Sequence, residues 1–356
     1  MKLLSIIVPA YNMEAYISQC IDSVLRTPSL AAVEIVVVND GSKDRTSRIA
    51  HEYADRFSDT VRVIDKPNGN YGSTINAALS KVRGEYVKIL DADDSFDGSR
   101  VADFLAFLRK MKGVDMVVSP FVEVVGGKER RVEYNLYARK VYEYAKQYDI
   151  EKVFEDGAIR FFMMHGVCYR TELLRSMGYR QTEGISYTDQ EWVFYPLFKV
   201  QTVAFADIPL YRYNLSREGQ TMDAKVQMRS LSQLVALTEA LAQYFVAYSR
   251  SIESPSRVNF LRNVVADRMR IVYRKYLLLM NDADFAASDF VMVDARLDCL
   301  AKQCRIAELQ VPVNNLFKVD LLGYWRAKGR RHRSSTRVLL QLVDSFMVWG
   351  YSLIFK

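Results

Sequence analysis

The segment Tyr86-Val87-Lys88-Ile89-Leu90-Asp91-Ala92-Asp93-Asp94 runs from a mostly apolar stretch into three carboxylates. The stretch before Asp91 predicts a buried strand that ends in negative charge. Because alternate residues of a strand share one face, we expect Asp91 and Asp93 to converge on one cation and Asp94 to lie off that face. A hard divalent ion held by one or two carboxylates completes its shell with phosphate oxygens and water. From this segment alone, a solvated acidic turn that stops a strand is the alternative.

Strand and helix signals alternate through the first 120 residues. Apolar, β-branched runs predict strands at residues 4–8, 34–38, 61–64, 86–90 and 115–118, and helical periodicity predicts helices at 14–26, 44–57, 73–82 and 100–111. Strands separated by helices of this length imply right-handed βαβ units. We therefore predict an α/β fold with a Rossmann-like, mostly parallel sheet flanked by helices.

Polar clusters follow three of these strands. They are Pro9-Ala10-Tyr11-Asn12, Asn39-Asp40-Gly41-Ser42 and the acidic segment that begins at Asp91. Ligands of such sheets bind beyond the carboxyl ends of the strands, so the three clusters are expected to meet at one edge. There, Asp40 is placed to accept a hydrogen bond from N3–H of uracil, with Tyr11 against the base; ordinary turn chemistry is the alternative for Asp40.

A glycine-containing turn at residues 68–73 precedes the third helix and offers exposed amides to a phosphate or ribose. No GxGxxG motif follows the first strand, and no GxxxxGK[ST] motif occurs in the chain. These absences count against a dinucleotide-dependent oxidoreductase and against a P-loop NTPase.

Four motifs in order, at residues 5–12, 37–42, 70–76 and 91–93, resemble those of the family-2 glycosyltransferases with the GT-A fold. The similarity continues through residues 187–192 and 211–214. This resemblance implies an inverting enzyme that uses a nucleotide-sugar donor, of the type that builds bacterial polysaccharides or lipid-linked oligosaccharides. The motif that marks processive members, Gln-x-x-Arg-Trp, is missing from the chain, which favours transfer of a single sugar.

The resemblance also implies roles for individual residues. Asp189 corresponds to the general base, and Asp93 and Asp91 to the ligands of Mn²⁺ or Mg²⁺. The implied nucleotide-binding set is Pro9, Ala10, Tyr11, Asp40, Gly72, Asn76, Asp91, Ala92 and Asp93. Ile75 is a departure, because an arginine often stands at that position, so a diphosphate contact must come from elsewhere.

Other residues near these motifs have competing interpretations. Glu191 is an alternative general base, although acids are also common at a helix N-terminus. Arg212, Arg217 and Gln220 are candidates for contacts with diphosphate or acceptor. His165 is interpreted as a structural histidine. Five tyrosines between residues 122 and 149 suggest an acceptor-contacting insertion, but a partly buried hairpin and helix is favoured.

The length of the chain and its sequence patterns predict how it divides into domains. The chain has 356 residues and a net charge of +7. We predict a glycosyltransferase domain at residues 1–221, with a nucleotide-binding half at 1–120 and an acceptor half at 121–221, then a helical region at 222–323 with helices at 225–249 and 257–280. The four cysteines show no zinc-site spacing and are expected to be reduced core residues of a cytoplasmic protein.

The last predicted region, residues 324–356, combines a cluster of arginines and lysines with an apolar segment at 338–355. Asp344 near the middle of that segment disfavours a membrane span. A helix on the inner surface of the cell membrane is preferred, with the basic cluster on anionic headgroups. Packing against the body or against a second copy of the chain is the alternative, and nucleic acid is disfavoured as a partner.

Taken together, these patterns predict a metal-dependent transferase that moves one sugar from a UDP-sugar to a hydroxyl of a glycan or lipid-linked acceptor. A catalytically silent binder of nucleotide sugars with the same fold is the alternative. The sugar, the acceptor and the oligomeric state are not encoded in these motifs.

Overall fold

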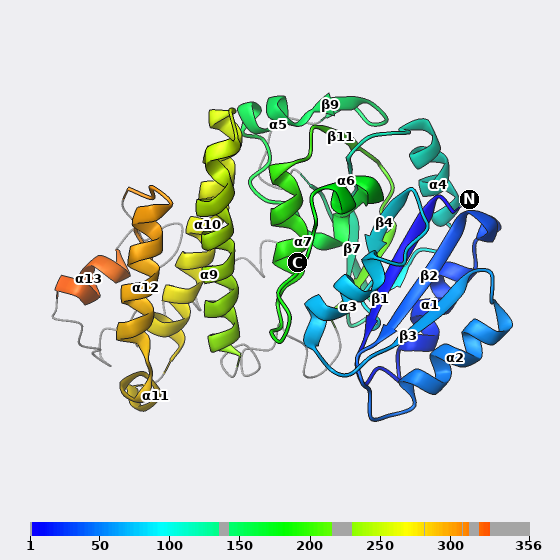
Figure 1. The fold of residues 1–356 in the computed structure, drawn as a ribbon, viewed down its shortest axis with the longest axis horizontal. Coiled ribbons are helices and arrows are strands. Elements are labelled where there is room, and N and C mark those ends of the chain that lie inside the picture. Colours follow the sequence, from blue (N-terminus) through cyan, green and yellow to red (C-terminus); the bar gives the residue numbers. More distant parts are fainter. Residues whose placement is uncertain are drawn as a thin grey trace. The chain divides into compact units, whose positions relative to one another are not determined.

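A central sheet organises the N-terminal part of the chain (Figure 1). The structure, a computed structural model, describes residues 2–134, 142–215, 230–280, 282–307, 309–312 and 320–327. Within these residues, eight strands pair in the order β3-β2-β1-β4-β10-β6-β11-β9. Only β9 and β10 of this set run antiparallel to their neighbours. The strands are β1 (Leu4–Ala10), β2 (Val33–Asn39), β3 (Val61–Asp65), β4 (Tyr86–Ile89), β6 (Met116–Val118), β9 (Gln147–Asp149), β10 (Val167–Arg170) and β11 (Thr202–Phe205).

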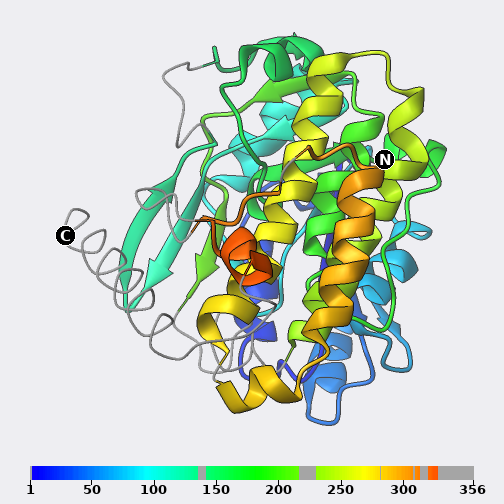
Figure 2. The ribbon, with the colours of Figure 1, turned by 90° about the vertical axis from the view of Figure 1, so that its left-hand side faces the viewer.

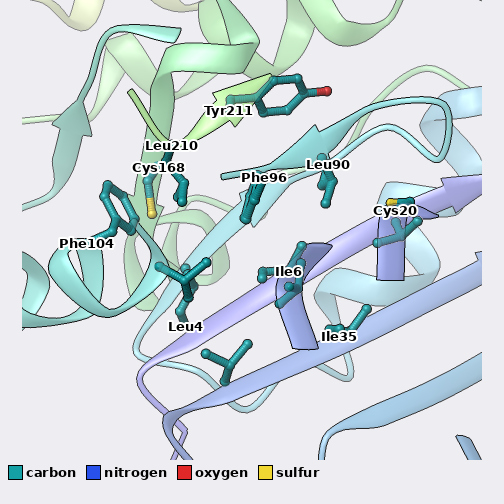
Figure 3. Close-up of a cluster of buried hydrophobic side chains, with 14 of the residues drawn as sticks. Leu4, Ile6, Cys20, Ile35, Leu90, Phe96, Phe104, Cys168, Leu210 and Tyr211 are labelled. Carbon is teal, nitrogen blue, oxygen red and sulfur yellow. The ribbon is translucent and has the colours of Figure 1, made fainter. Parts of the chain in front are cut away.

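The central strands are buried on both faces, which explains their continuous apolar runs. Every residue of β1 and β2 is buried, and the two strands pair in parallel with Ile6 opposite Ile35. Residues of one face, including Leu4 and Ile6, form a core cluster with side chains of the flanking helices, among them Cys20 and Phe104 (Figure 3). The sheet therefore forms a rigid platform whose strand ends carry the polar clusters.

The helices between these strands occur where the periodicity predicts them, with ends that differ by a few residues. They are α1 (Ile17–Leu25), α2 (Thr46–Arg56), α3 (Asn70–Leu79) and α4 (Val101–Lys110), followed later in the chain by α5 (Ile150–Asp156), α6 (Thr171–Ser176) and α7 (Asp189–Phe194). Helix α3 is shifted at both ends, to Asn70–Leu79 from the predicted 73–82, and α1 begins at Ile17 rather than at Glu14. The predicted α/β fold with a mostly parallel sheet is confirmed.

A second sheet, not predicted from the sequence, lies beside the acidic segment. It pairs β5 (Ser95–Phe96), β12 (Tyr211–Asn214), β7 (Phe121–Val125) and β8 (Lys128–Val132) in that order. Gly126 and Gly127 connect β7 to β8 with φ angles of 55° and 80°, values that glycine adopts readily. The hairpin favoured for this region is thus confirmed, but the helix expected with it is absent from the described residues 122–134 and 142–149, and α5 begins only at Ile150.

The chain divides into two compact units. The first contains Met1–Gln220 together with Ile252–Phe260, and the second contains Thr221–Ser251 and Leu261–Lys356. In the described residues the second unit is helical, as predicted, and Figure 2 shows its long helices side by side. Its helices are α9 (Leu231–Tyr248), the greater part of α10 (Pro255–Arg274), α11 (Asp282–Ala287), α12 (Phe290–Gln303) and α13 (Leu321–Ala327).

The C-terminal segment and the cysteines are the subject of two further predictions. The apolar segment 338–355 lies outside the described residues, and so do Arg217 and Gln220. None of the helices in the described ranges is long and apolar enough to cross a bilayer. Cys20, Cys168 and Cys304 are buried free thiols, as expected, but Cys299 is exposed on α12, so the prediction that it belongs to the core is wrong.

Candidate active site

The loops after β1 and β2 are locked together at the carboxyl edge of the sheet. Asn12, which has a φ of 53°, accepts a hydrogen bond from Lys43 N at 2.8 Å, and its own N–H donates to Ser42 Oγ at 3.0 Å. Thr46 Oγ1 accepts from Met13 N at 2.7 Å. These contacts confirm that the first two polar clusters meet, and they hold the residues between them in place.

Three predicted base-framing residues have different exposures. Pro9 and Ala10 are buried in the last positions of β1, whereas the side chain of Tyr11 is 45% exposed. An exposed aromatic ring beside a rigid strand end has a free face for stacking. Of the three, Tyr11 is the one whose side chain is available to a planar base.

Asp40 follows β2 and is held by several donors. Its Oδ1 accepts hydrogen bonds from Lys66 Nζ at 2.6 Å and from Gly69 N at 3.0 Å, and the carboxylate is buried. Lys66 also donates to Ser73 Oγ at 2.8 Å. Asp40 thus joins the loop after β2 to the start of α3.

Gly72 and Asn76 face a neighbouring loop. A Cβ on Gly72 would lie 2.1 Å from the carbonyl oxygen of Thr182, so the backbone of α3 touches that of the loop. Asn76 Nδ2 donates to Gln181 O at 2.9 Å, and Asn76 Oδ1 accepts from Gln181 N at the same distance. Both residues therefore bind α3 to the segment that leads to α7. Ile75, between them in the sequence, is completely buried.

The acidic segment forms a tight turn after β4. Asp94 N donates to Asp91 O at 3.0 Å, so the backbone reverses instead of continuing as a strand. The pleat argument for a shared face of Asp91 and Asp93 is accordingly wrong, because the two residues belong to a turn. Asp91 and Asp93 are partly exposed, whereas Ala92 and Asp94 are buried.

Asp94 is turned away from solvent, as its exclusion from the predicted ligands requires. Its Oδ2 accepts from the hydroxyl of Tyr211 at 2.6 Å and its Oδ1 from Asn214 N at 2.7 Å. Burial and the charges of Asp91 and Asp93 raise the pKa of the Asp94 carboxyl well above its usual range. Asp94 therefore fastens the acidic turn to β12.

Two tyrosines connect the acidic turn with Asp189. The hydroxyl of Tyr71 donates to Asp91 Oδ1 at 2.8 Å. Burial raises the pKa of Tyr71, and the negative charges of Asp91 and Asp189 raise it further. The pKa of Tyr213 is raised by burial and by the charges of Asp94, Asp91, Asp93 and Asp189. The charges of Asp91 and Asp189, which are about 100 residues apart in sequence, thus act on the same two tyrosines.

Glu191, the alternative base, is buried and hydrogen-bonded within the protein. Its carboxylate is buried and accepts hydrogen bonds from Thr182 N and Thr182 Oγ1, both at 2.6 Å, and from Tyr195 OH at 3.0 Å. Burial raises the pKa of Glu191. Asp189, the first residue of α7, is partly exposed and accepts from Gln190 Nε2 at 2.8 Å. The geometry favours Asp189 over Glu191 for contact with a ligand.

Arg212 and His165, two further candidates, each have other neighbours. Arg212 on β12 pairs with Glu129 on β8. His165 is buried among aromatic rings, which agrees with a structural role, but its Nδ1 has no hydrogen-bond partner in the described part of the chain.

Sequence reasoning missed Lys66, Tyr71, Tyr211 and Tyr213. Each of these side chains acts through a contact with a residue distant in sequence, such as Tyr211 with Asp94. No spacing rule predicts such pairs. A partial signal was present for Tyr71, because it stands inside the glycine-containing turn that was already singled out.

The donor atoms at the acidic turn suit a hard divalent cation. Asp91 and Asp93 offer carboxylate oxygens, which Mg²⁺ and Mn²⁺ prefer, and one or two carboxylates are the usual contribution of the protein in sites that also bind phosphates. No group of three His, Cys, Asp or Glu side chains with metal-binding geometry occurs in the described ranges.

Comparisons with known proteins agree with this arrangement. The profile of glycosyl transferase family 2 matches residues 5–178. The uncharacterized glycosyltransferase EpsJ of Bacillus subtilis is 47% identical over 92 residues, which are 26% of each chain. The chain thus spans about a quarter of the length of this curated relative, and it spans 42% of a second one, the MG025 homolog of Mycoplasma pneumoniae.

Solved structures share the fold over most of the chain. S. aureus TarS 1–349 in complex with UDP-GlcNAc has a TM-score of 0.61 and 19% identity, over 94% of this chain and 93% of that one. The mannosyltransferase PcManGT from Pyrobaculum calidifontis, in complex with GDP-Man and Mn²⁺, has a TM-score of 0.50 and 14% identity, over 97% and 84%. At these identities the likeness concerns the fold alone. The profile match, the ordered motifs and the sheet edge described above identify residues 5–178 as a glycosyl transferase family 2 domain, and the fold is that of the GT-A glycosyltransferases.

Proposed function

We propose that this protein transfers one sugar from a UDP-sugar to a hydroxyl group of a glycan or lipid-linked acceptor, with inversion at the anomeric carbon. Asp189 is the general base, and Asp91 and Asp93 hold Mn²⁺ or Mg²⁺. The observation that carries the proposal is the hydrogen bond from the Tyr71 hydroxyl to Asp91 Oδ1 at 2.8 Å, and the charge of Asp189 also raises the pKa of this phenol. This supports a leaving-group site at the acidic turn and a base at Asp189 that act on the same substrate.

The nucleotide would lie along this edge. The exposed ring of Tyr11 would stack on the base, and the Asp40 carboxylate after β2 would accept a hydrogen bond from the N–H edge of the base. A fixed carboxylate beside a stacking ring selects a base with a donor at that edge. This arrangement supports uridine as the nucleoside.

Asp189 supplies the proton acceptor. Its position at the first residue of α7 places the carboxylate near the positive end of the helix. A carboxylate within reach of an attacking hydroxyl accelerates proton removal by about 10²- to 10⁴-fold. Attack from the side opposite the diphosphate inverts the sugar carbon, and a divalent cation bound at the acidic turn would stabilise the negative charge on the leaving diphosphate.

The alternative is a protein that binds nucleotide sugars without turning them over. A screen of UDP-sugars for Mn²⁺-dependent UDP release, with wild type and Asp189→Asn side by side, separates the two. We expect the variant to bind UDP as wild type does and to lose at least about 10²-fold in turnover. Asp207→Asn is the matched control, because Asp207 is an exposed acid of the same domain that pairs with Arg131.

The results have distinct meanings. Full activity of Asp189→Asn would refute the assignment of the base. UDP binding without release from any donor, in wild type, would favour the silent binder. Release that persists in EDTA would contradict the metal site at Asp91 and Asp93.

A further inference from the structure

The acidic turn is connected to β12 by a buried hydrogen-bonded network, and the proposed chemistry does not use this network directly. The hydroxyl of Tyr211 donates to Asp94 Oδ2 at 2.6 Å and accepts from Asp91 N at 3.2 Å. Asp94 Oδ1 accepts from Asn214 N at 2.7 Å. The Tyr211 oxygen therefore contacts both ends of the turn, Asp91 and Asp94. The Asp94 carboxylate in turn binds two residues of β12, Tyr211 and Asn214.

The ring of Tyr211 is itself immobilised. The side chain is completely buried, and it packs edge-on against Phe96 with ring centroids 5.8 Å apart and against His165 with centroids 4.8 Å apart. The ammonium group of Lys88 lies 5.7 Å from the ring centroid. Figure 3 shows the side chain of Tyr211 together with Phe96 and Leu90 in one apolar cluster. A hydroxyl on a ring held in this way has little freedom to move.

From this geometry we propose that Tyr211 and Asp94 are positioning residues that hold the acidic turn in the shape that binds the cation and the diphosphate. This role rests on the proposed function, since it presupposes a cation at Asp91 and Asp93. Carboxylates brought together by a turn repel one another, and a turn without fixed partners would open to separate them. The Tyr211 hydroxyl and the Asn214 amide are neutral donors, so they order the turn without occupying the carboxylates of Asp91 or Asp93.

The same contacts couple the acidic turn to the rest of the site. Tyr213, one residue before Asn214, stacks on His165 at a centroid distance of 4.2 Å. The charges of Asp91, Asp93 and Asp189 all act on Tyr213. Strand β12 thus carries both the hydroxyl that orders the turn and, two residues later, a phenol placed among the site carboxylates.

The test is Tyr211→Phe, which removes one oxygen and keeps the ring. Tyr86→Phe is the matched control: Tyr86 is also completely buried, and its hydroxyl also holds a turn, donating to Met111 O at 2.9 Å and accepting from Gly113 N at 3.0 Å. Calorimetry measures the affinity for UDP with Mn²⁺ and with EDTA. Removing a partner that orients metal ligands typically weakens metal binding about 10- to 100-fold.

We expect Tyr211→Phe to weaken Mn²⁺-dependent UDP binding by that factor and to leave binding in EDTA unchanged, while Tyr86→Phe changes neither. Asp94→Asn should weaken Mn²⁺-dependent UDP binding in the same way. The double variant should bind UDP no more weakly than the single variant with the lower affinity, because both side chains act through the same hydrogen-bonded network. Asp94→Asn also provides the test if Tyr211→Phe does not fold.

The outcomes separate the two proposals. If wild type binds UDP equally with Mn²⁺ and with EDTA, the proposed metal-dependent function is overturned. If wild type shows a Mn²⁺-dependent gain that Tyr211→Phe and Asp94→Asn retain to the same extent as Tyr86→Phe, only the positioning role is overturned.

Discussion

His165 shows how strongly a single buried residue responds to its surroundings. Its ring lies among Phe121, Tyr211 and Tyr213, and its backbone carbonyl accepts a hydrogen bond from Lys88 Nζ at 2.6 Å. Burial lowers the pKa of His165 to about 3, and the charge of Lys88 contributes to the decrease. The folded protein therefore keeps this imidazole neutral at pH values where the unfolded chain protonates it.

This difference makes a testable contribution to acid stability. Because the folded pKa lies below the unfolded value of about 6.5, stability is intact above pH 6.5 and is lost as pH falls towards 3. Between pH 7 and pH 5, we expect the free energy of unfolding of wild type to fall by about 2 kcal/mol more than that of His165→Phe, at about 1.4 kcal/mol per pKa unit. Urea unfolding at several pH values measures this difference.

The comparison also isolates the cause. Lys88→Met removes the neighbouring cation and should raise the pKa of His165 in the folded protein, so the loss of stability that His165 causes should level off at a higher pH than in wild type. Equal slopes for wild type and His165→Phe would show that the imidazole is protonated within the fold.

At the scale of elements, helix α3 connects the donor side of the site to the base. Its first turn contacts Asp40 through Ser73 and Lys66, and its second contacts the segment 181–183 through Asn76. Thr182 in that segment is the hydrogen-bond partner of Glu191, two residues from Asp189. A displacement of α3 should therefore reach α7.

Gly72→Ala tests this connection. Alanine normally stabilises a helix by about 1 kcal/mol relative to glycine, but here its Cβ would meet Thr182 O at 2.1 Å. We expect a loss of about 1–3 kcal/mol in the free energy of unfolding, as for other overpacked sites, and a fall in turnover because the segment before Asp189 must move.

The control for this variant is Gly157→Ala. Gly157 has a φ of 61°, and no atom lies within 4 Å of the point that an alanine Cβ would occupy, so alanine costs about 1–2 kcal/mol through the backbone alone. It should lower stability and leave turnover unchanged. Normal turnover of Gly72→Ala would contradict a link between α3 and Asp189.

Particular elements show where prediction from the sequence succeeded. Strands β1 and β2 are buried throughout, so their apolar runs revealed them and placed Asp40 and Tyr11 at a shared edge. The strands of the second sheet are short, and β8 exposes four of its five residues, so the sequence favoured a hairpin there but did not predict the sheet that β7 and β8 form with β5 and β12. The contact of Tyr71 with Asp91 and that of Tyr211 with Asp94 depend on tertiary packing, which local periodicity does not encode.

At the scale of the whole molecule, the first unit is completed by a late segment of the chain. Residues 252–260 belong to this unit although the preceding residues 221–251 belong to the second. Arg257 is the main polar anchor of the segment. It donates to Val200 O at 2.8 Å and pairs with Glu151 at 2.5 Å, and its side chain is 3% exposed. Phe260 packs on Phe154 with a centroid distance of 4.7 Å.

Arg257→Met should therefore destabilise the first unit specifically. The change leaves Glu151 without its cation and a buried carbonyl without its donor, which together cost about 3 kcal/mol.

Trp192 is completely buried in this unit, so its fluorescence reports unfolding there once Trp325 and Trp349 are replaced by Phe. In that background, urea unfolding of Arg257→Met should begin at a lower concentration than in the parent protein. Arg296→Met is the control, because Arg296, which pairs with Glu239, has a side chain that is 47% exposed, and ion pairs of exposed side chains contribute about 1 kcal/mol or less. Adding Glu151→Leu to Arg257→Met should recover part of the loss, since no buried charge then lacks a partner. An unchanged Trp192 transition in Arg257→Met would mean that the first unit is stable without the anchor of residues 252–260.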